Sequence, residues 1–189
     1  MVLRNGGQLY VDTVDRKPPG VFWIYAGLQW LTGSTALWIP RCAGMVAHTL
    51  TAWLVWRIAR HVTTERGAAI AGILSAISSG ALIPRDAQAA NFEVFMLPFI
   101  CASILFALQH RPARSGISLG LAIMMKQTAG VTVLPLVWIL FKAKGWRGVL
   151  ILCATAVLPV AGAAWITGPE QFWFWVFGKA NSGYIDIGG

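Results

Sequence analysis

The fold of this chain is decided around residues 9–20, which read Leu9-Tyr10-Val11-Asp12-Thr13-Val14-Asp15-Arg16-Lys17-Pro18-Pro19-Gly20. This stretch holds two carboxylates, then two consecutive cations, then a double proline, and almost everything after it is apolar. Clustered charges of this kind require water or a polar pocket. Because proline suits the first turn of a helix, we expect a short apolar helix to begin here and to run to Thr32.

The composition indicates a membrane protein. Of the 189 residues, 57% are hydrophobic and 12% are charged, whereas soluble domains carry about 25% charged residues. We therefore predict an all-α fold, a polytopic membrane helical bundle. We attribute the formal net charge of +8 to lysines and arginines that anchor the cytoplasmic loops. No nucleic-acid partner is therefore expected. The cysteines lie singly in apolar runs, without the spacing of a disulfide or metal site: Cys42, Cys101 and Cys153.

The apolar runs predict how the bundle is divided. Gly20–Thr32 has about 13 residues, too few for a span of about 20, so we expect a re-entrant or interfacial helix at 18–33. A lysine at the bilayer centre would cost about 2.5–3.5 kcal/mol or more. Gly116–Leu140 is therefore interpreted as two short helices that meet at Lys126. About six crossings are then expected within residues 36–167: Ala36–Ala59, Gly67–Ile83, Phe92–Leu108, Gly116–Met125, Ala129–Leu140 and Val149–Ile166.

The distribution of charge predicts the orientation. If the short helix does not cross, every basic loop falls on one side and all the acids except Glu65 fall on the other. Because Lys and Arg mark the cytoplasmic side, residues 1–17 are predicted to form an extracytoplasmic loop and residues 168–189 an extracytoplasmic aromatic interfacial tail. The basic loops are marked by Arg57, Arg60, Arg66, Arg111, Arg114, Lys142, Lys144 and Arg147.

This topology gathers charged groups on the extracytoplasmic side. Carboxylates beside fixed cations suit a phosphate-bearing substrate, because the cations hold phosphate and a carboxylate can act as a base or hold a metal. The group consists of Asp12, Asp15, Arg16, Lys17, Arg85, Asp86, Glu93 and Lys126.

Simpler interpretations of these residues stay open. Asp12 and Asp15 could be solvated loop residues, Lys17 a lipid anchor, and Arg85-Asp86 a plain loop pair. Glu93 lies one residue into an apolar run and should have a partner, because an unpaired carboxylate there is costly. Its candidate partners are Arg41, Arg85 and Lys126.

Four segments together resemble the dolichyl-phosphate-mannose–protein mannosyltransferase superfamily, whose members are membrane glycosyltransferases of the GT-C class. The most distinctive is Gly7-x-Leu9-Tyr10-Val11-Asp12-x-x-Asp15-x-Lys17-Pro18-Pro19, which is similar to the family's first-loop motif. The others are Leu37-Trp38-Ile39-Pro40-Arg41, Arg85-Asp86-Ala87-Gln88-Ala89-Ala90-Asn91-Phe92-Glu93, and Gly120-Leu121-Ala122 followed by Lys126-Gln127-Thr128. Many members have Thr where this chain has Phe92.

The resemblance implies an activity. The donor would be a sugar on a polyprenyl phosphate, transferred with inversion to a protein, lipid or glycan acceptor on the outer face, in an integral protein of the bacterial plasma membrane. It implies Asp12, Asp15 and Glu93 as catalytic candidates, for base, metal or acceptor contacts. Lys17 would be the phosphate ligand, and Arg85, Lys126 and Tyr10 would contribute to substrate binding. No cofactor is implied with certainty, and a divalent metal stays open.

Two further expectations accompany the resemblance. Family members begin with a transmembrane helix and an acidic base early in the first loop, and they continue with more helices. We therefore expect this chain to be a fragment, which could bind donor without catalysing transfer. The alternative function is a secondary transporter or flippase for a lipid-linked or anionic solute, with Lys126 at a broken-helix site.

Overall fold

The computed structural model describes residues 3, 6–13, 15–81 and 90–178. These residues form helices joined by loops, with one isolated bridge between Leu9 and Thr13, so the predicted all-α fold is confirmed. The helical elements are α1 (Gly20–Thr32), α2 (Trp38–Ala59), α3 (Glu65–Ala81), α5 (Phe92–Leu108), α6 (Pro112–Met125), η2 (Gln127–Thr132), α7 (Val133–Thr167), α8 (Pro169–Phe172) and the π-helical turn η3 (Trp173–Phe177).

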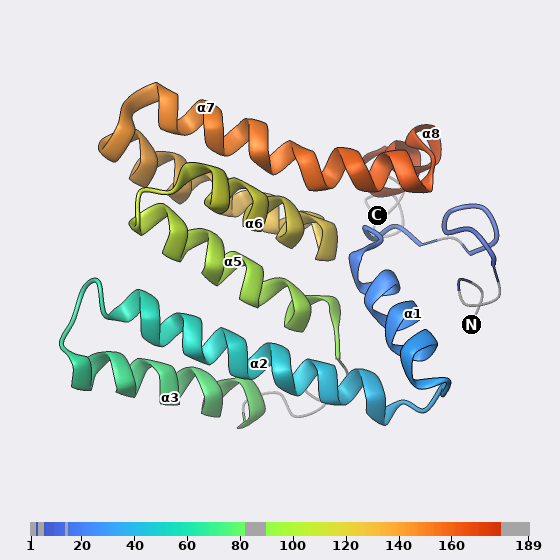
Figure 1. The fold of residues 1–189 in the computed structure, drawn as a ribbon, viewed down its shortest axis with the longest axis horizontal. Helices are drawn as coiled ribbons and strands as arrows, with labels where there is room; N and C mark the ends of the chain where they lie inside the picture. The colour runs from blue at the N-terminus through green and yellow to red at the C-terminus, as the bar shows by residue number, and fades with distance from the viewer. Residues whose placement is uncertain (1–2, 4–5, 14, 82–89, 179–189) are drawn as a thin grey trace, which may run out of the picture.

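The long helices lie roughly side by side, and α1 crosses one end of the bundle (Figure 1). The connection from α2 to α3, the connection from α5 to α6 and the bend of α7 all lie at the opposite end, on the left of the view. The loop that precedes α1 lies near α8, on the right. The basic loops of the sequence therefore share one end of the bundle, while the loop with Asp12 and Asp15 lies at the other.

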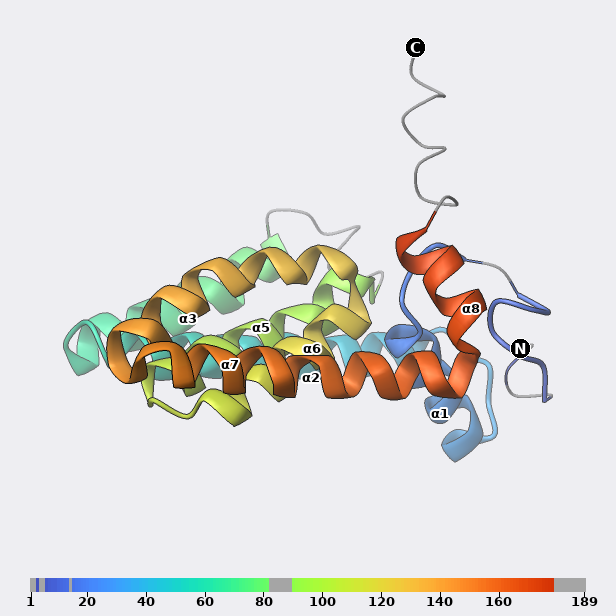
Figure 2. The ribbon, with the colours of Figure 1, turned by 90° about the horizontal axis from the view of Figure 1, so that it is seen from above.

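The element α7 consists of two helices joined at Gly145. This residue has non-helical torsions (φ 59°, ψ −158°), and the chain turns back there (Figure 2). Leu136 and Leu140 from the first half pack with Leu152 from the second half in one buried cluster. Among the described residues, Gln127–Thr167 is the one helical stretch long and apolar enough, by length and composition alone, to cross a membrane, although the chain turns back within it at Gly145; Phe92–Leu108 is a shorter apolar helix.

Small residues bring α6 into close contact with its neighbours. Gly116 and Gly120, four residues apart, face the second half of α7, where a Cβ on Gly116 would lie 2.3 Å from the Leu152 carbonyl oxygen. This spacing of small residues is typical of tightly packed membrane helices. On the α5 side, the Ser103 hydroxyl donates to the Ser115 carbonyl at 2.8 Å, and the Ser115 hydroxyl donates to the Ser103 carbonyl at 2.9 Å. Both serines are fully buried.

The junction expected at Lys126 is present. Helix α6 ends at Met125, Lys126 has an extended backbone (φ −155°, ψ 128°), and the short helix η2 leads into α7. Helix α1 occupies the same residues as the expected short helix, and its first residue, Gly20, packs on the end of α6, where a Cβ would lie 2.6 Å from the Met124 carbonyl oxygen. Whether α1 is re-entrant or interfacial stays a prediction.

The outer surface of the bundle is strongly apolar. On α3, the exposed side chains include Ile70, Ile73, Leu74 and Ile77, each more than half exposed. Other exposed large apolar side chains lie on α1, α2, both halves of α7 and η3: Trp30, Leu31, Trp38, Met45, Val46, Trp138, Leu150, Val157, Leu158 and Trp173. Extensive exposed apolar surface marks a membrane or protein interface, as expected of a bundle that contacts lipid.

Candidate functional site

The loop before α1 is held by its own carboxylates. Asp12 accepts a hydrogen bond from the Gln8 backbone N–H at 2.8 Å, and Asp15 accepts one from the Lys17 backbone N–H at 3.1 Å. Tyr10 has a left-handed backbone (φ 71°), which is uncommon outside glycine, and its N–H donates to the Thr13 carbonyl at 2.7 Å. The loop is therefore a defined turn, with both predicted carboxylates placed by backbone contacts.

Tyr10 connects this loop to Lys17. Its side chain is 3% exposed, and its hydroxyl donates to the Lys17 carbonyl oxygen at 2.7 Å. Its ring also makes an edge contact with Phe172 of α8, at 6.3 Å between centroids. Burial, together with the negative charge of Asp15, raises the pKa of the Tyr10 phenol well above its ordinary value of 10.0. Tyr10 is therefore a neutral donor that fixes the backbone at Lys17.

The Lys17 side chain lies over the ring of Phe92. Its ammonium nitrogen is 4.3 Å from the ring centroid, a cation–π geometry. Phe92 in turn makes an edge contact with Phe22 of α1, at 5.5 Å between centroids. The next two residues after Lys17, Pro18 and Pro19, are fully buried. Lys17 is exposed while the residues on its C-terminal side are fixed in the core.

Glu93 follows Phe92 in the first turn of α5 and forms an ion pair with Lys126. Three cations were candidate partners for Glu93, and the partner in the structure is Lys126, at the break between α6 and η2. Arg41 is exposed on α2, and Arg85 lies outside the described residues. Lys17 also interacts electrostatically with Glu93. Two ammonium groups from distant parts of the chain therefore converge on the first turn of α5.

A further contact joins the two segments that carry these lysines. The Gln127 side-chain amide donates to the Arg16 carbonyl oxygen at 3.4 Å, across 111 residues of sequence. Nearby, the Tyr25 hydroxyl of α1 donates to the Ala90 carbonyl at 3.1 Å, just before α5 begins. We call Lys17, Phe92, Glu93 and Lys126 the lysine cluster. It is assembled from the loop, the start of α5 and the end of α6.

Sequence reasoning selected three of these four residues and passed over Phe92. Phe92 stood out in the sequence only as a departure from the family pattern, but its ring is the surface under Lys17. Asp12 and Asp15 contact the backbone of their own loop. Among the described residues, no group of three or more His, Cys, Asp or Glu side chains is placed to hold a metal ion.

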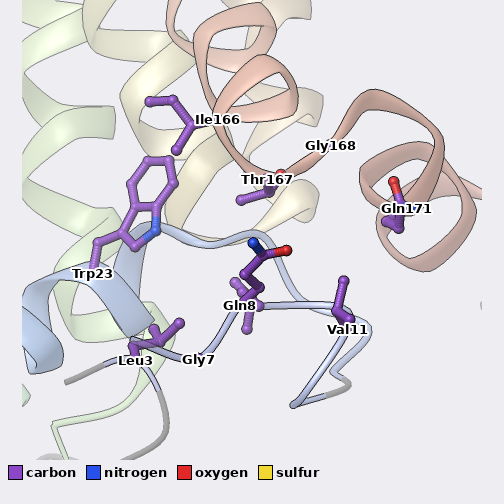
Figure 3. A pocket seen from close by; sticks show the side chains of 10 residues that line it. Leu3, Gly7, Gln8, Val11, Trp23, Ile166, Thr167, Gly168 and Gln171 are labelled. Atoms are coloured by element: carbon purple, nitrogen blue, oxygen red, sulfur yellow. The ribbon is translucent and has the colours of Figure 1, made fainter. Parts of the chain in front are cut away.

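A pocket of about 330 Å³ lies on another side of the same loop. Its walls come from the loop, from α1, from the end of α7 and from the first turn after it (Figure 3). Gln8 and Leu9 contribute from the loop, Trp23 from α1, and Thr167 and Gln171 from the opposite wall. Phe22, which contacts the lysine cluster through Phe92, is the neighbour of Trp23 on α1.

The family model for dolichyl-phosphate-mannose-protein mannosyltransferase matches residues 16–173 of this chain. The matched range includes the whole lysine cluster and begins just after Asp15. No curated protein and no solved structure matches the chain. Members of the family are integral membrane glycosyltransferases, so the match favours glycosyl transfer over the transporter alternative. Because the match covers most of the sequence, the chain belongs to the dolichyl-phosphate-mannose-protein mannosyltransferase family.

Proposed function

We propose that the chain acts in the transfer of a sugar from a polyprenyl-phosphate donor to an acceptor on the outer face of the membrane, with inversion at the anomeric carbon. The observation that carries the proposal is the convergence of Lys17 and Lys126 on the first turn of α5. Two ammonium groups at one end of an apolar bundle suit the phosphate of a donor whose prenyl tail stays in lipid.

Lys17 is assigned as the main phosphate ligand. Its ammonium lies over a ring and is exposed. Among the described residues the ion pair at this site is the one between Lys126 and Glu93, so a phosphate oxygen can approach Lys17 without breaking that pair. The leaving phosphate gains negative charge as the sugar–phosphate bond breaks, and a nearby fixed cation stabilises that charge. Lys126 is assigned a supporting role, because Glu93 already holds its ammonium in place.

Glu93 lies in a different environment from Asp12 and Asp15, and we assign it a different role. Glu93 is engaged by Lys126 and is assigned to positioning that lysine. Asp12 is exposed and Asp15 half-buried on the loop, and each is available to accept a proton from an acceptor hydroxyl or to contact the acceptor. An inverting reaction needs such a base on the side of the sugar opposite the leaving group. Arg85 is retained as a candidate substrate ligand from the sequence alone.

The arrangement of charge supports the proposed orientation. The basic loops share the end of the bundle opposite the lysine cluster (Figure 1). With the basic end in the cytoplasm, the cluster and the loop with Asp12 and Asp15 lie on the extracytoplasmic side. In a bacterial plasma membrane, this is the side on which a donor flipped from the cytoplasmic leaflet would be used.

The activity is tested with a radiolabelled sugar on a short polyprenyl phosphate, in sealed vesicles that contain the purified chain. The proposal predicts label in a glycoside product when donor and acceptor share the extracytoplasmic side, and less of that label in Glu93→Gln, which removes the partner of Lys126. Movement of intact donor from one leaflet to the other, with no glycoside formed, would support the transporter alternative and contradict the proposal.

A further inference from the structure

The pocket beside the loop has a chemistry unlike that of the lysine cluster. All the described residues that line it are uncharged. These lining residues offer no cation to a phosphate or a carboxylate, so they favour an uncharged ligand. The volume of about 330 Å³ lies at the lower end of the range for small-molecule sites, which is about 300–1,000 Å³.

The polar groups of the pocket are the kind that recognise hydroxyls. Gln8 and Gln171 each offer an amide oxygen that accepts and an amide nitrogen that donates. Both side chains are exposed. Gln8 lies between Trp23 and Val11 in Figure 3, and Thr167 lies above it in the view. The sugar hydroxyl is a donor and an acceptor at once, and it is therefore matched by amide groups better than by a purely apolar wall.

Trp23 gives the pocket an aromatic face. It lies on α1, and its indole ring stands between the loop and Ile166 (Figure 3). The carbon–hydrogen face of a sugar ring is apolar, and a large aromatic ring offers it extensive contact area at little cost in conformational freedom. An aromatic face combined with uncharged amides suits a neutral saccharide.

The opposite wall is shaped by Gly168, between α7 and α8. Its φ of +90° is a conformation that glycine adopts without strain, and a Cβ at this position would lie 2.6 Å from the Gln171 side-chain oxygen. The turn therefore places Gln171 close against the backbone at the pocket wall. An alanine here would strain the turn and displace the Gln171 amide.

The pocket and the lysine cluster are neighbours through α1 and the loop. Phe22 contacts the Phe92 ring beneath Lys17, while Trp23 lines the pocket. Leu9 lines the pocket, while the next residue, Tyr10, donates to the Lys17 carbonyl. A ligand in the pocket would therefore contact residues that are sequence neighbours of the residues around Lys17.

We infer that this pocket binds a neutral saccharide unit, which makes the acceptor a glycan rather than a peptide or a lipid phosphate. The inference rests on the proposed function, because it supplies the second substrate of that reaction. The shared chemistry is a neutral sugar, and the sugar of the donor is the other source from which it could come. The two sources differ in whether binding requires the prenyl phosphate.

The experiment measures ligand binding by saturation-transfer NMR on the chain in nanodiscs. The probes are neutral methyl hexosides and pentosides, a serine- and threonine-containing peptide, and a short polyprenyl phosphate with and without a sugar. Gln8→Ala and Gln171→Ala are compared with Gln109→Ala, the same substitution just after α5, whose C-terminal end lies at the opposite end of the bundle. Gly168→Ala serves as a second way to displace Gln171.

We expect at least one methyl glycoside to bind, and to bind roughly three- to tenfold more weakly to Gln8→Ala and Gln171→Ala, in keeping with loss of a neutral hydrogen bond. Gln109→Ala should match the wild type, and polyprenyl phosphate without sugar should bind every variant equally. Binding of the peptide with no glycoside bound, or glycoside binding that neither glutamine affects, would overturn the inference.

The remaining outcomes separate this inference from the proposed function. The two glutamine variants could weaken the binding of only the sugar-bearing polyprenyl phosphate, with no free glycoside bound by any variant. In that case the pocket holds the donor's sugar, and the assignment of a glycan acceptor fails. If polyprenyl phosphate does not bind while a glycoside does, the donor assignment fails and the pocket stands.

Discussion

Lys126, the extended residue between α6 and η2, forms an ion pair with Glu93 in the first turn of α5. The side chains are 28% and 52% exposed, respectively. The pair fastens the break in one helix to the beginning of another. Because partly exposed pairs contribute about 0–1 kcal/mol, we assign it mainly to positioning rather than to overall stability.

A double-mutant cycle measures that pair. Lys126→Met and Glu93→Gln should each lower the free energy of unfolding by about 1 kcal/mol or less, and the double variant should lose less than the sum of the two. The measurement is thermal unfolding in nanodiscs for all four proteins. Strictly additive losses would show that the two side chains are not coupled.

Two glycine-to-alanine substitutions in α6 and α7 should change stability in opposite directions. Gly116→Ala should destabilise strongly, because the new Cβ would lie 2.0 Å from the Thr155 hydroxyl oxygen and 2.3 Å from the Leu152 carbonyl oxygen. Gly162→Ala, in the second half of α7, meets no neighbour within 4 Å and should stabilise by about 0.5–1 kcal/mol.

Melting temperature and yield after membrane extraction check both glycine predictions. Overpacking typically costs about 1–3 kcal/mol, so the two variants should differ by several degrees. Equal melting temperatures for Gly116→Ala and the wild type would contradict the observed contact between the helices.

Tyr10 gives a pH prediction. Burial and Asp15 raise the pKa of its phenol in the folded chain above the ordinary value of 10.0. Its stabilising effect is complete below pH 10 and is lost as the pH rises from 10 towards the folded value, because the unfolded chain releases the proton first. The melting temperature of the wild type should therefore fall more steeply above pH 10 than that of Tyr10→Phe.

The comparison between these two proteins isolates Tyr10, because the lysines that also titrate in this range are common to both. Below pH 10, Tyr10→Phe should cost about 1 kcal/mol for the lost hydrogen bond to the Lys17 carbonyl. Parallel curves for the two proteins above pH 10 would show that the phenol is not held in a buried site.

The orientation is tested by labelling single cysteines at positions 13 and 64 in a chain whose native cysteines have been replaced. Thr13 lies in the loop before α1, and Thr64 lies just before α3, at the other end of the bundle. A membrane-impermeant thiol reagent should label position 13 from the extracytoplasmic side and position 64 from the cytoplasmic side. Labelling of both from the same side would mean that α1 crosses the membrane.

Much of the fold was predictable from the apolar runs and from one lysine, Lys126, that lies within such a run. The lengths of the runs predicted α1, α2, α3 and α5, and the cost of burying Lys126 predicted the break after α6. Gly145 was not predicted to be the turn within α7, because the basic residues around it indicated a loop without selecting a residue. The contact of Gly116 and Gly120 with α7 was also missed, although the spacing of small residues is visible in the sequence.

The sequence allowed most residues of the candidate site to be predicted, but not which of them contact one another. Charge in an apolar chain singled out Lys17, Glu93 and Lys126, and the cost of an unpaired carboxylate required a partner for Glu93. Which cation would be selected depended on the tertiary packing of α5 against α6. The neutral pocket gave no sequence signal, because Gln8, Trp23 and Gln171 carry no charge and lie far apart in the chain.

We propose that Lys17 holds the donor's phosphate. Lys17→Ala should reduce sugar transfer by about 10²-fold or more, because electrostatic stabilisation of a leaving group is commonly worth a few kcal/mol. Lys17→Arg should be partly active, since a planar guanidinium does not replace a compact ammonium. Lys142→Ala is the matched control, because Lys142 also lies over an aromatic ring, 5.0 Å from the Trp138 centroid, against 4.3 Å for Lys17 over Phe92.

The most direct measurement is the affinity of these variants for a labelled short polyprenyl phosphate in nanodiscs, taken alongside the transfer rate. We predict that Lys17→Ala binds the polyprenyl phosphate at least tenfold more weakly at unchanged melting temperature, while Lys142→Ala binds it as the wild type does. If Lys17→Ala and Lys142→Ala bind the polyprenyl phosphate equally well, Lys17 is a lipid anchor and the assignment of the phosphate site is wrong.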